Sequence, residues 1–237
     1  GDRSPRRQGA HLPRKAKFDP PPETAALRRQ LQEALGTQDE QGRVVSEAQH
    51  GVYLFYDYDG EPVYVGQTYE GLRTRIRRHL TNQRTDAVAM NVLDPFEVAE
   101  IEMWPLWELA GRSRDEAKQR LNEAEYTVYA KAVEESEHGA ILNEGDVPPT
   151  ELIELPPSAR IRIVPDEIFE DRKHPDTRIA RRASTIAALA RVISEREVRK
   201  GLRRTLLTQA KRLEHLAEQR LREADEEVPE QSPTNEV

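Results

Sequence analysis

The sequence predicts an α+β protein: a small unit in which helices flank a central antiparallel sheet of three strands, followed by a mainly helical extension that forms a hairpin. Three patterns predict it. Strand-like runs surround an Asp-Gly turn near residue 60, stretches of helical periodicity follow them, and two long apolar stripes of helical spacing occupy the last third of the chain. Hydrophobic residues make up 36% of the 237 residues and charged residues 33%, so we expect the core to occupy only part of the length.

The composition excludes several classes of site. The absence of cysteine excludes disulfides and thiolate metal sites, and the six histidines show no zinc-ligand spacing. No apolar run is long enough to span a membrane and no signal peptide is predicted, so a cytoplasmic location is expected. The net charge of −7 averages over segregated charges, with basic stretches at residues 1–17 and 71–85 and an acidic tail at 223–237. Because a phosphate ligand responds to the local field, the net charge does not exclude a nucleic acid partner.

Composition and periodicity divide the chain into five predicted parts. A compact unit is expected at residues 50–146, and a proline-containing connector with a helical extension, for dimerisation or DNA binding, at 147–224. The remaining parts are a basic disordered arm at 1–22, a short helix with a linker at 23–49, and an acidic disordered tail at 225–237.

The compact unit opens with a predicted β-hairpin. Two β-rich runs, residues 51–57 and 62–66, surround Asp59-Gly60, which is typical of a two-residue hairpin loop. This loop would place Phe55 opposite Tyr64 and Tyr53 opposite Gly66. Strand alternation then separates two faces. The aliphatic face is expected to be core and consists of Val52, Leu54, Val63 and Val65, whereas the aromatic face is expected to display its phenols beside a glycine that permits close approach.

Residues 71–80 have the pattern of a basic helix. Arg75 and His79 lie four residues apart along one edge of its apolar stripe and are expected to point toward the hairpin. The other arginines of this helix, Arg73, Arg77 and Arg78, are expected to face solvent. On composition alone, a basic surface helix is the favoured interpretation.

A third strand and a second helix complete the unit. Residues 96–103 alternate apolar and acidic side chains and predict a strand. Ser113 and Glu116 form a predicted capping box at the start of the helix. Glu125 lies about 40° from Leu121, inside the apolar stripe of this helix. A carboxylate there is costly unless it is paired or binds a metal ion, so Glu125 needs an explanation.

These residues, taken in order, resemble the motifs of the GIY-YIG nuclease superfamily. The resemblance covers about residues 50–145 and rests on two tyrosine tripeptides, an arginine helix, a helical glutamate and a later asparagine. In this sequence they are Gly51-Val52-Tyr53, Tyr64-Val65-Gly66, Leu72-Arg73-Thr74-Arg75, Glu125 and Asn143. Two departures stand out. Glu125 and Asn143 are far apart, which predicts an insertion near residues 134–139, and Gln67 occupies a position that is often lysine in repair members.

The resemblance implies a metal-dependent phosphodiester hydrolase that acts on DNA. It implies a Mg²⁺ or Mn²⁺ ion held by Glu125, with Arg75 stabilising charge on the phosphate. Tyr64, assisted by Tyr53, would take the proton of the attacking water, and His79 would support the tyrosine or the leaving group. Asn143 matches the asparagine that closes the motif. The nucleic-acid contacts are expected from Arg73, Arg77, Arg78 and Gln67.

Each of these residues also has a purely structural interpretation. The tyrosines could be ordinary cross-strand aromatics, and Arg75 one member of a solvated basic face. Glu125 could pair with Arg120, and Asn143 could be a turn residue. Three functions therefore remain open: a restriction or defence endonuclease that acts alone or as a homodimer; a repair or mobile-element nickase; and a non-catalytic DNA-binding or assembly protein on a nuclease fold.

The C-terminal third predicts two helices joined near Gly201. Several arginines, among them Arg178, Arg181 and Arg182, lie on these helices. We expect them either to be solvated or to meet DNA phosphates.

Overall fold

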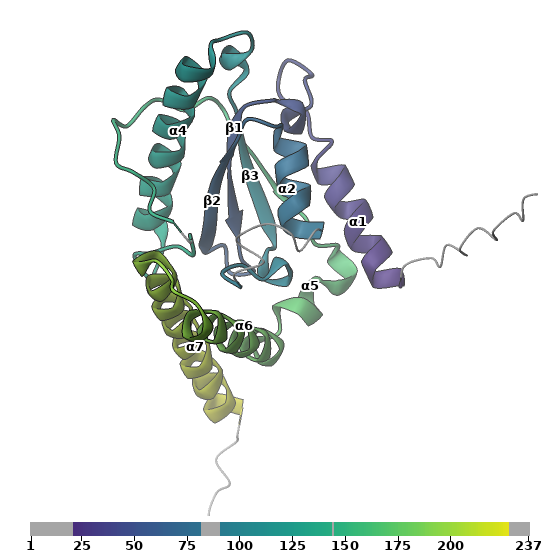
Figure 1. Ribbon diagram of the computed structural model, residues 1–237. Coiled ribbons are helices and arrows are strands. Elements are labelled where there is room, and N and C mark those ends of the chain that lie inside the picture. The colour runs from purple at the N-terminus through teal and green to yellow at the C-terminus, as the bar shows by residue number, and fades with distance from the viewer. Residues whose placement is uncertain (1–20, 82–90, 144, 228–237) are drawn as a thin grey trace, which may run out of the picture.

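The computed structural model describes residues 21–81, 91–143 and 145–227, and its core is an antiparallel sheet between two helical layers (Figure 1). The sheet has four strands in the order β2-β1-β3-β4. The predicted α+β class is confirmed, with one strand more than the three expected. The strands are β1 (Gly51–Tyr56), β2 (Pro62–Thr68), β3 (Glu100–Pro105) and β4 (Ala159–Arg162).

The register of the first hairpin is as predicted. Phe55 pairs with Tyr64 and Tyr53 pairs with Gly66. The loop, however, has three residues rather than two. The Asp57 N–H donates to the Glu61 carbonyl over 3.0 Å, and Gly60, with φ 77°, occupies the left-handed conformation that this wider loop requires. A register shift next to Phe55 compensates for the extra residue, so the pairing further along the strands is unchanged.

Both faces of the hairpin are buried, which corrects the expectation that the phenols are displayed. Helix α4 (Arg114–Glu135), which begins with the predicted Ser113–Glu116 capping box, packs on the face of Val52, Leu54 and Val65. Helices α2 (Leu72–Thr81) and α1 (Pro22–Ala34) cover the opposite face (Figure 1). The apolar stripe of α2 covers the aromatic side chains, so Tyr53 is fully buried and Tyr64 is 4% exposed. Val63 belongs to this aromatic cluster rather than to the aliphatic one.

The fourth strand comes from a segment that the sequence predicts to be irregular. Ala159–Arg162 pairs with the free edge of β3, with Ile161 opposite Ile101. A run of four residues between prolines has little propensity of its own, so the strand depends on the edge that it joins. Short 3₁₀ helices occupy the loops: η1 (Val45–Glu47), η2 (Pro95–Glu97) and η3 (Trp107–Leu109).

The C-terminal extension is a helical hairpin, as predicted. After the short helix α5 (Asp166–Lys173), helices α6 (Pro175–Glu195) and α7 (Lys200–Glu227) pack against each other below the sheet (Figure 1). Among the described residues, no helix combines the length and the apolar character needed to cross a membrane. The predicted disordered arm and most of the acidic tail lie outside the described residues.

A buried ion-pair cluster attaches this hairpin to the sheet. Arg178, Arg182 and Arg212 are 1%, 5% and 2% exposed, and each donates a hydrogen bond to the same oxygen of Asp57, over 3.2, 3.0 and 2.7 Å. Glu97 also lies in the cluster and accepts from Arg182 over 3.2 Å. Burial and the neighbouring Arg212 hold the pKa of Arg182 below its usual value. The expectation that Arg178 and Arg182 are solvated or meet DNA is therefore wrong.

Candidate active site

A buried tyrosine–histidine pair lies between β1 and α2. The Tyr53 hydroxyl and His79 Nε2 are 2.8 Å apart, and the ring of Tyr64 lies 5.2 Å from that of His79. His79 is 1% exposed. Burial, with the nearby positive charges of Arg75 and Arg78, lowers the pKa of His79 to about 3. The imidazole is therefore neutral at physiological pH and can exchange a hydrogen bond with the phenol.

Gly66 makes room for this pair. A Cβ atom built on Gly66 would overlap the ring and hydroxyl of Tyr53, its cross-strand partner. The tyrosine ring thus folds over the glycine, which explains why the second tripeptide ends in this residue.

Arg75 connects the phenols to the molecular surface. Burial lowers the pKa of its guanidinium, but the nearby phenols of Tyr53 and Tyr64 more than offset this and leave the pKa above its usual value. Its Nε atom is buried and has no hydrogen-bond partner in the described part of the chain, while the side chain lines a surface groove. The charge of Arg75 therefore lies where an anionic group in the groove can meet it.

Glu125 lies on the other side of β2 and is half-buried against Gln67. The Gln67 amide nitrogen donates to the Glu125 carboxylate over 2.9 Å and to the Asn122 side-chain oxygen over 2.8 Å. Arg120, the structural partner considered from the sequence, instead contacts Glu108 and Glu123 at 3.7 and 3.8 Å. The Glu125 carboxylate, predicted on the buried side of its helix, is thus held by Gln67 of β2.

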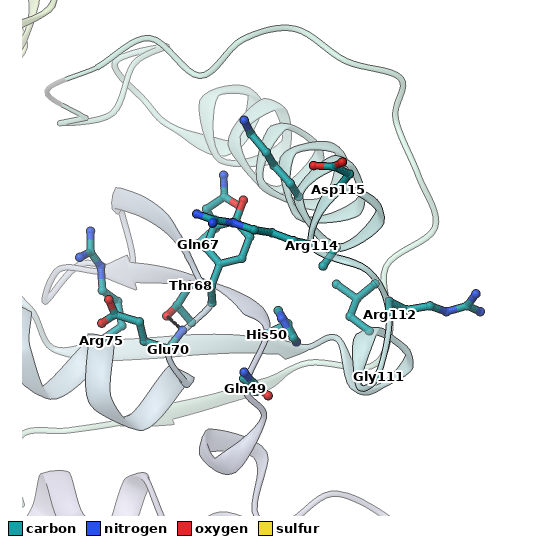
Figure 2. Close-up of a pocket in the computed structure, with 14 residues that line it drawn as sticks. Gln49, His50, Gln67, Thr68, Glu70, Arg75, Gly111, Arg112, Arg114 and Asp115 are labelled. Atoms are coloured by element: carbon teal, nitrogen blue, oxygen red, sulfur yellow. Dashed lines mark hydrogen bonds between the residues drawn. The ribbon is translucent and has the colours of Figure 1, made fainter.

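The groove brings these two groups together. It has a volume of about 1100 Å³ and runs between the end of β2, the start of α2 and the start of α4 (Figure 2). Gln67 and Arg75 line it, so the groove is bounded by the partner of Glu125 on one side and by the arginine beside the phenols on the other. Glu125, Tyr53 and Tyr64 lie behind these two lining residues.

The groove has a basic wall that the sequence analysis missed. Arg112, Arg114 and Lys118, around the first turn of α4, line it together with Asp115. Figure 2 shows Arg114 extending from α4 toward Gln67. The signal was available, because these cations surround the Ser113 cap, but the capping box was interpreted only as a helix start.

Tyr69 was also missed. This residue is 38% exposed, lines the groove and packs edge-to-face on His50 with ring centroids 6.3 Å apart. Burial raises the pKa of its phenol, and the nearby carboxylate of Glu125 raises it further. An exposed aromatic ring therefore lies at the mouth of the groove close to Glu125.

Asn143 lies at the outer edge of β2 rather than in the groove. Its side-chain oxygen accepts from the Val65 N–H over 3.1 Å, and its nitrogen donates to the Val65 carbonyl over 2.9 Å. The Asn143 amide thus makes the two hydrogen bonds to Val65 that a neighbouring strand would make, next to Tyr64. Helix α4 continues to Glu135 and a turn follows, which accounts for the long interval between Glu125 and Asn143.

The other predicted nucleic-acid contacts have different surroundings. Arg73 donates to the Leu35 carbonyl over 2.9 Å and so ties α2 to the end of α1. Arg78 pairs with Glu70 at 2.6 Å, and Arg77 is exposed. Of the three arginines, Arg77 retains the solvent-facing position that was expected.

The donor atoms at Glu125 fit a hard divalent cation. The site offers a carboxylate and the buried Gln67 Oε1 atom, which has no hydrogen-bond partner among the described residues. No group of three or more potential metal-ligating side chains exists in the described ranges. A cation here would take one carboxylate and keep most of its ligands as waters, which is how magnesium usually binds.

Comparison with known proteins identifies the domain that carries this site. A family model for the GIY-YIG catalytic domain matches residues 49–127, which span β1 to the middle of α4. A search of curated proteins and a search of solved structures found no match. The matched range contains Tyr53, Tyr64, Arg75, His79 and Glu125, and Asn143 lies beyond it. The match covers a third of the chain and supports membership of this domain in the GIY-YIG nuclease superfamily.

Proposed function

We propose that the protein is a DNA endonuclease of restriction or defence type that uses Mg²⁺ or Mn²⁺. The observation that supports the proposal is the groove, which is lined by Arg75, by the basic wall and by Gln67, the hydrogen-bond partner of Glu125. Its dimensions and charge suit a phosphodiester backbone, which Arg114 and Lys118 can follow without reading bases.

The residues divide the work of hydrolysis. Glu125 would hold the metal ion, which when bound would supply Lewis-acid stabilisation to the phosphate and its leaving oxygen. Arg75 donates to a non-bridging oxygen as negative charge develops there. Tyr64 takes the proton of the attacking water, and the adjacent guanidinium of Arg75 stabilises the phenolate by its charge. Neutral His79 fixes the orientation of Tyr53, which supports Tyr64.

We assign target selection and dimerisation to the parts of the chain outside the catalytic domain. Target selection is assigned to segments outside the groove, because backbone contacts carry no sequence information. A double-strand break requires two active sites, and we assign the α6–α7 hairpin to dimerisation. Arg77 remains a candidate for a peripheral phosphate contact.

Cleavage of supercoiled plasmid tests the proposal. Wild-type protein should cut in Mg²⁺ and not in EDTA, and Glu125→Gln should abolish cutting. Glu134→Gln, which changes an exposed carboxylate on the same helix, is the matched control and should leave cleavage unchanged. Linear fragments of discrete size would support a restriction enzyme, whereas nicked circles would support the repair or mobile-element nickase. Folded protein that binds DNA but cleaves none of plasmid, genomic or modified DNA would overturn the nuclease and support a binding role.

A further inference from the structure

The side chain of Gln67 holds two residues of α4 at once. Its Nε2 atom donates both of its hydrogens, one to Asn122 Oδ1 over 2.8 Å and one to Glu125 Oε2 over 2.9 Å. Asn122 and Glu125 are three residues apart and therefore lie on the same face of the helix. With both hydrogens engaged, the amide cannot rotate without losing a bond, so the position of its oxygen is determined.

That oxygen has no partner. Gln67 Oε1 is buried, and the described residues provide it with no hydrogen-bond donor. A buried acceptor without a donor costs free energy, and in folded proteins such atoms are usually satisfied by another group or by ordered water. Gln67 also lines the groove, so the donor that satisfies Oε1 can enter from there.

We propose that Gln67 is a positioning residue for the divalent cation of Glu125. Its amide nitrogen fixes one carboxylate oxygen of Glu125, and its Oε1 atom accepts a hydrogen bond from a water molecule that the hydrated cation carries. This inference rests on the proposed metal-dependent function and adds a residue that acts through Glu125 and through the ion's waters. A purely structural clamp between β2 and α4 would explain the double hydrogen bond but not the unpaired oxygen, whereas this role explains both.

The test measures metal binding in the absence of DNA, so that it does not depend on cleavage. Mn²⁺ is titrated into the full chain, and free Mn²⁺ is followed by electron paramagnetic resonance. Gln67→Met, which keeps the length of the side chain and removes its polar atoms, should weaken Mn²⁺ binding by about 10–100-fold, the usual effect of losing a partner that orients a metal ligand. Gln119→Met is the control, because Gln119 makes a similar 2.9 Å bond to Glu123 on the exposed side of α4, and it should bind Mn²⁺ like wild type.

A double-mutant cycle distinguishes positioning from general disruption. In a Glu125→Asp background, which keeps a carboxylate for Mn²⁺ but draws it away from Gln67, Gln67→Met should weaken Mn²⁺ binding less than it does in wild type, because the hydrogen bond to the carboxylate is already lost. In EDTA Gln67→Met should melt somewhat below wild type, because two hydrogen bonds between β2 and α4 are lost, and the stabilisation by added Mn²⁺ should shrink in addition. Gln67→Asn, whose shorter amide cannot reach both partners, should show the same loss and serves if Gln67→Met does not fold.

The outcomes separate this inference from the proposed function. If wild type binds no Mn²⁺, or binds it equally after Glu125→Gln, the metal site and the proposed function are overturned together. If Glu125→Gln abolishes binding and cleavage but Gln67→Met and Gln67→Asn bind Mn²⁺ like wild type, the role of Gln67 alone is overturned. A fall in melting temperature in EDTA without a change in Mn²⁺ affinity would assign Gln67 a structural role and would also overturn it.

Discussion

The Asp57→Asn substitution changes one buried charge while keeping the size of the side chain. In the wild type, one carboxylate oxygen of Asp57 accepts backbone bonds from Asp59 and Glu61 over 2.9 and 3.1 Å. An asparagine oxygen can keep these bonds and with them the hairpin loop. The other oxygen, which accepts from three guanidinium groups, becomes an amide that has no charge and presents its own donors to them.

The expected cost of Asp57→Asn is large because the arginines stay buried. Removing one partner of a buried ion pair typically costs ~3–5 kcal/mol, while the whole stability of a domain is ~5–15 kcal/mol. Arg212→Met should cost much less. It leaves two fully buried arginines, Arg178 and Arg182, facing the carboxylates of Asp57 and Glu97, and it removes two buried nitrogens of Arg212 that have no hydrogen-bond partner in the described residues. The large cost of breaking a buried ion pair comes from a charge left without a partner, and after Arg212→Met both carboxylates keep arginine partners.

Urea unfolding followed by circular dichroism measures both costs, and hydrogen exchange shows whether α6 and α7 lose protection first. Asp166→Asn is the control, since the same change at the exposed Arg162–Asp166 pair, 2.7 Å apart, should hardly alter stability. Our account of the cluster would be refuted if Asp57→Asn cost less than about 1 kcal/mol, or if Arg212→Met cost as much as Asp57→Asn.

Three further predictions concern the groove and the residues behind it. Gly66→Ala should abolish cleavage in the plasmid assay because its methyl group would displace the Tyr53 phenol, and retained activity at wild-type rate would contradict this contact. Between pH 6.5 and pH 3 the wild type should lose ~1.4 kcal/mol of stability for each pH unit, relative to His79→Gln. The reason is that the unfolded chain takes up a proton on His79, whereas the buried ring, with its pKa lowered to about 3, does not. If urea unfolding gave parallel stability curves for the two proteins over this pH range, His79 would not be a neutral buried histidine. Arg114→Glu should weaken DNA binding, measured by fluorescence anisotropy, and reduce the salt dependence of binding. The same charge change at Arg199, which is exposed and lies outside the groove, should have a smaller effect. Equal effects of the two substitutions would exclude a specific role of the basic wall.

The parts of the fold that the sequence predicts correctly are those determined by local patterns. The pairing of Tyr53 with Gly66 and the capping box at Ser113 follow from turn chemistry and helix-start rules that involve only neighbouring residues. Strand β4 was missed because Ala159–Arg162 forms a strand only beside the edge of β3. The burial of the aromatic face was missed for a similar reason, since alternation distinguishes two faces but does not reveal that α2 covers the second one.

The same distinction applies to the candidate site. The position of Glu125 on the buried side of its helix follows from periodicity, and the structure places it against Gln67. The surroundings of Arg178 could not be predicted, because its partner Asp57 lies in a loop some 120 residues earlier in the chain. Asn143 was expected to close the motif, but only the structure shows that its amide exchanges two hydrogen bonds with the backbone of Val65.

The bonds along the outer side of β2 determine how copies of the chain can meet. An open sheet edge is a template on which a foreign strand can grow, and this is a common start of aggregation. Here the Leu142 N–H donates to the Val63 carbonyl over 2.8 Å and the Asn143 amide occupies both backbone groups of Val65, so that template is already filled by the chain itself. The opposite edge, β4, is four residues long and carries two arginines. Self-association by strand addition is therefore disfavoured at both edges, and a second subunit would have to dock through helices, leaving the strand that carries Tyr64 undisturbed.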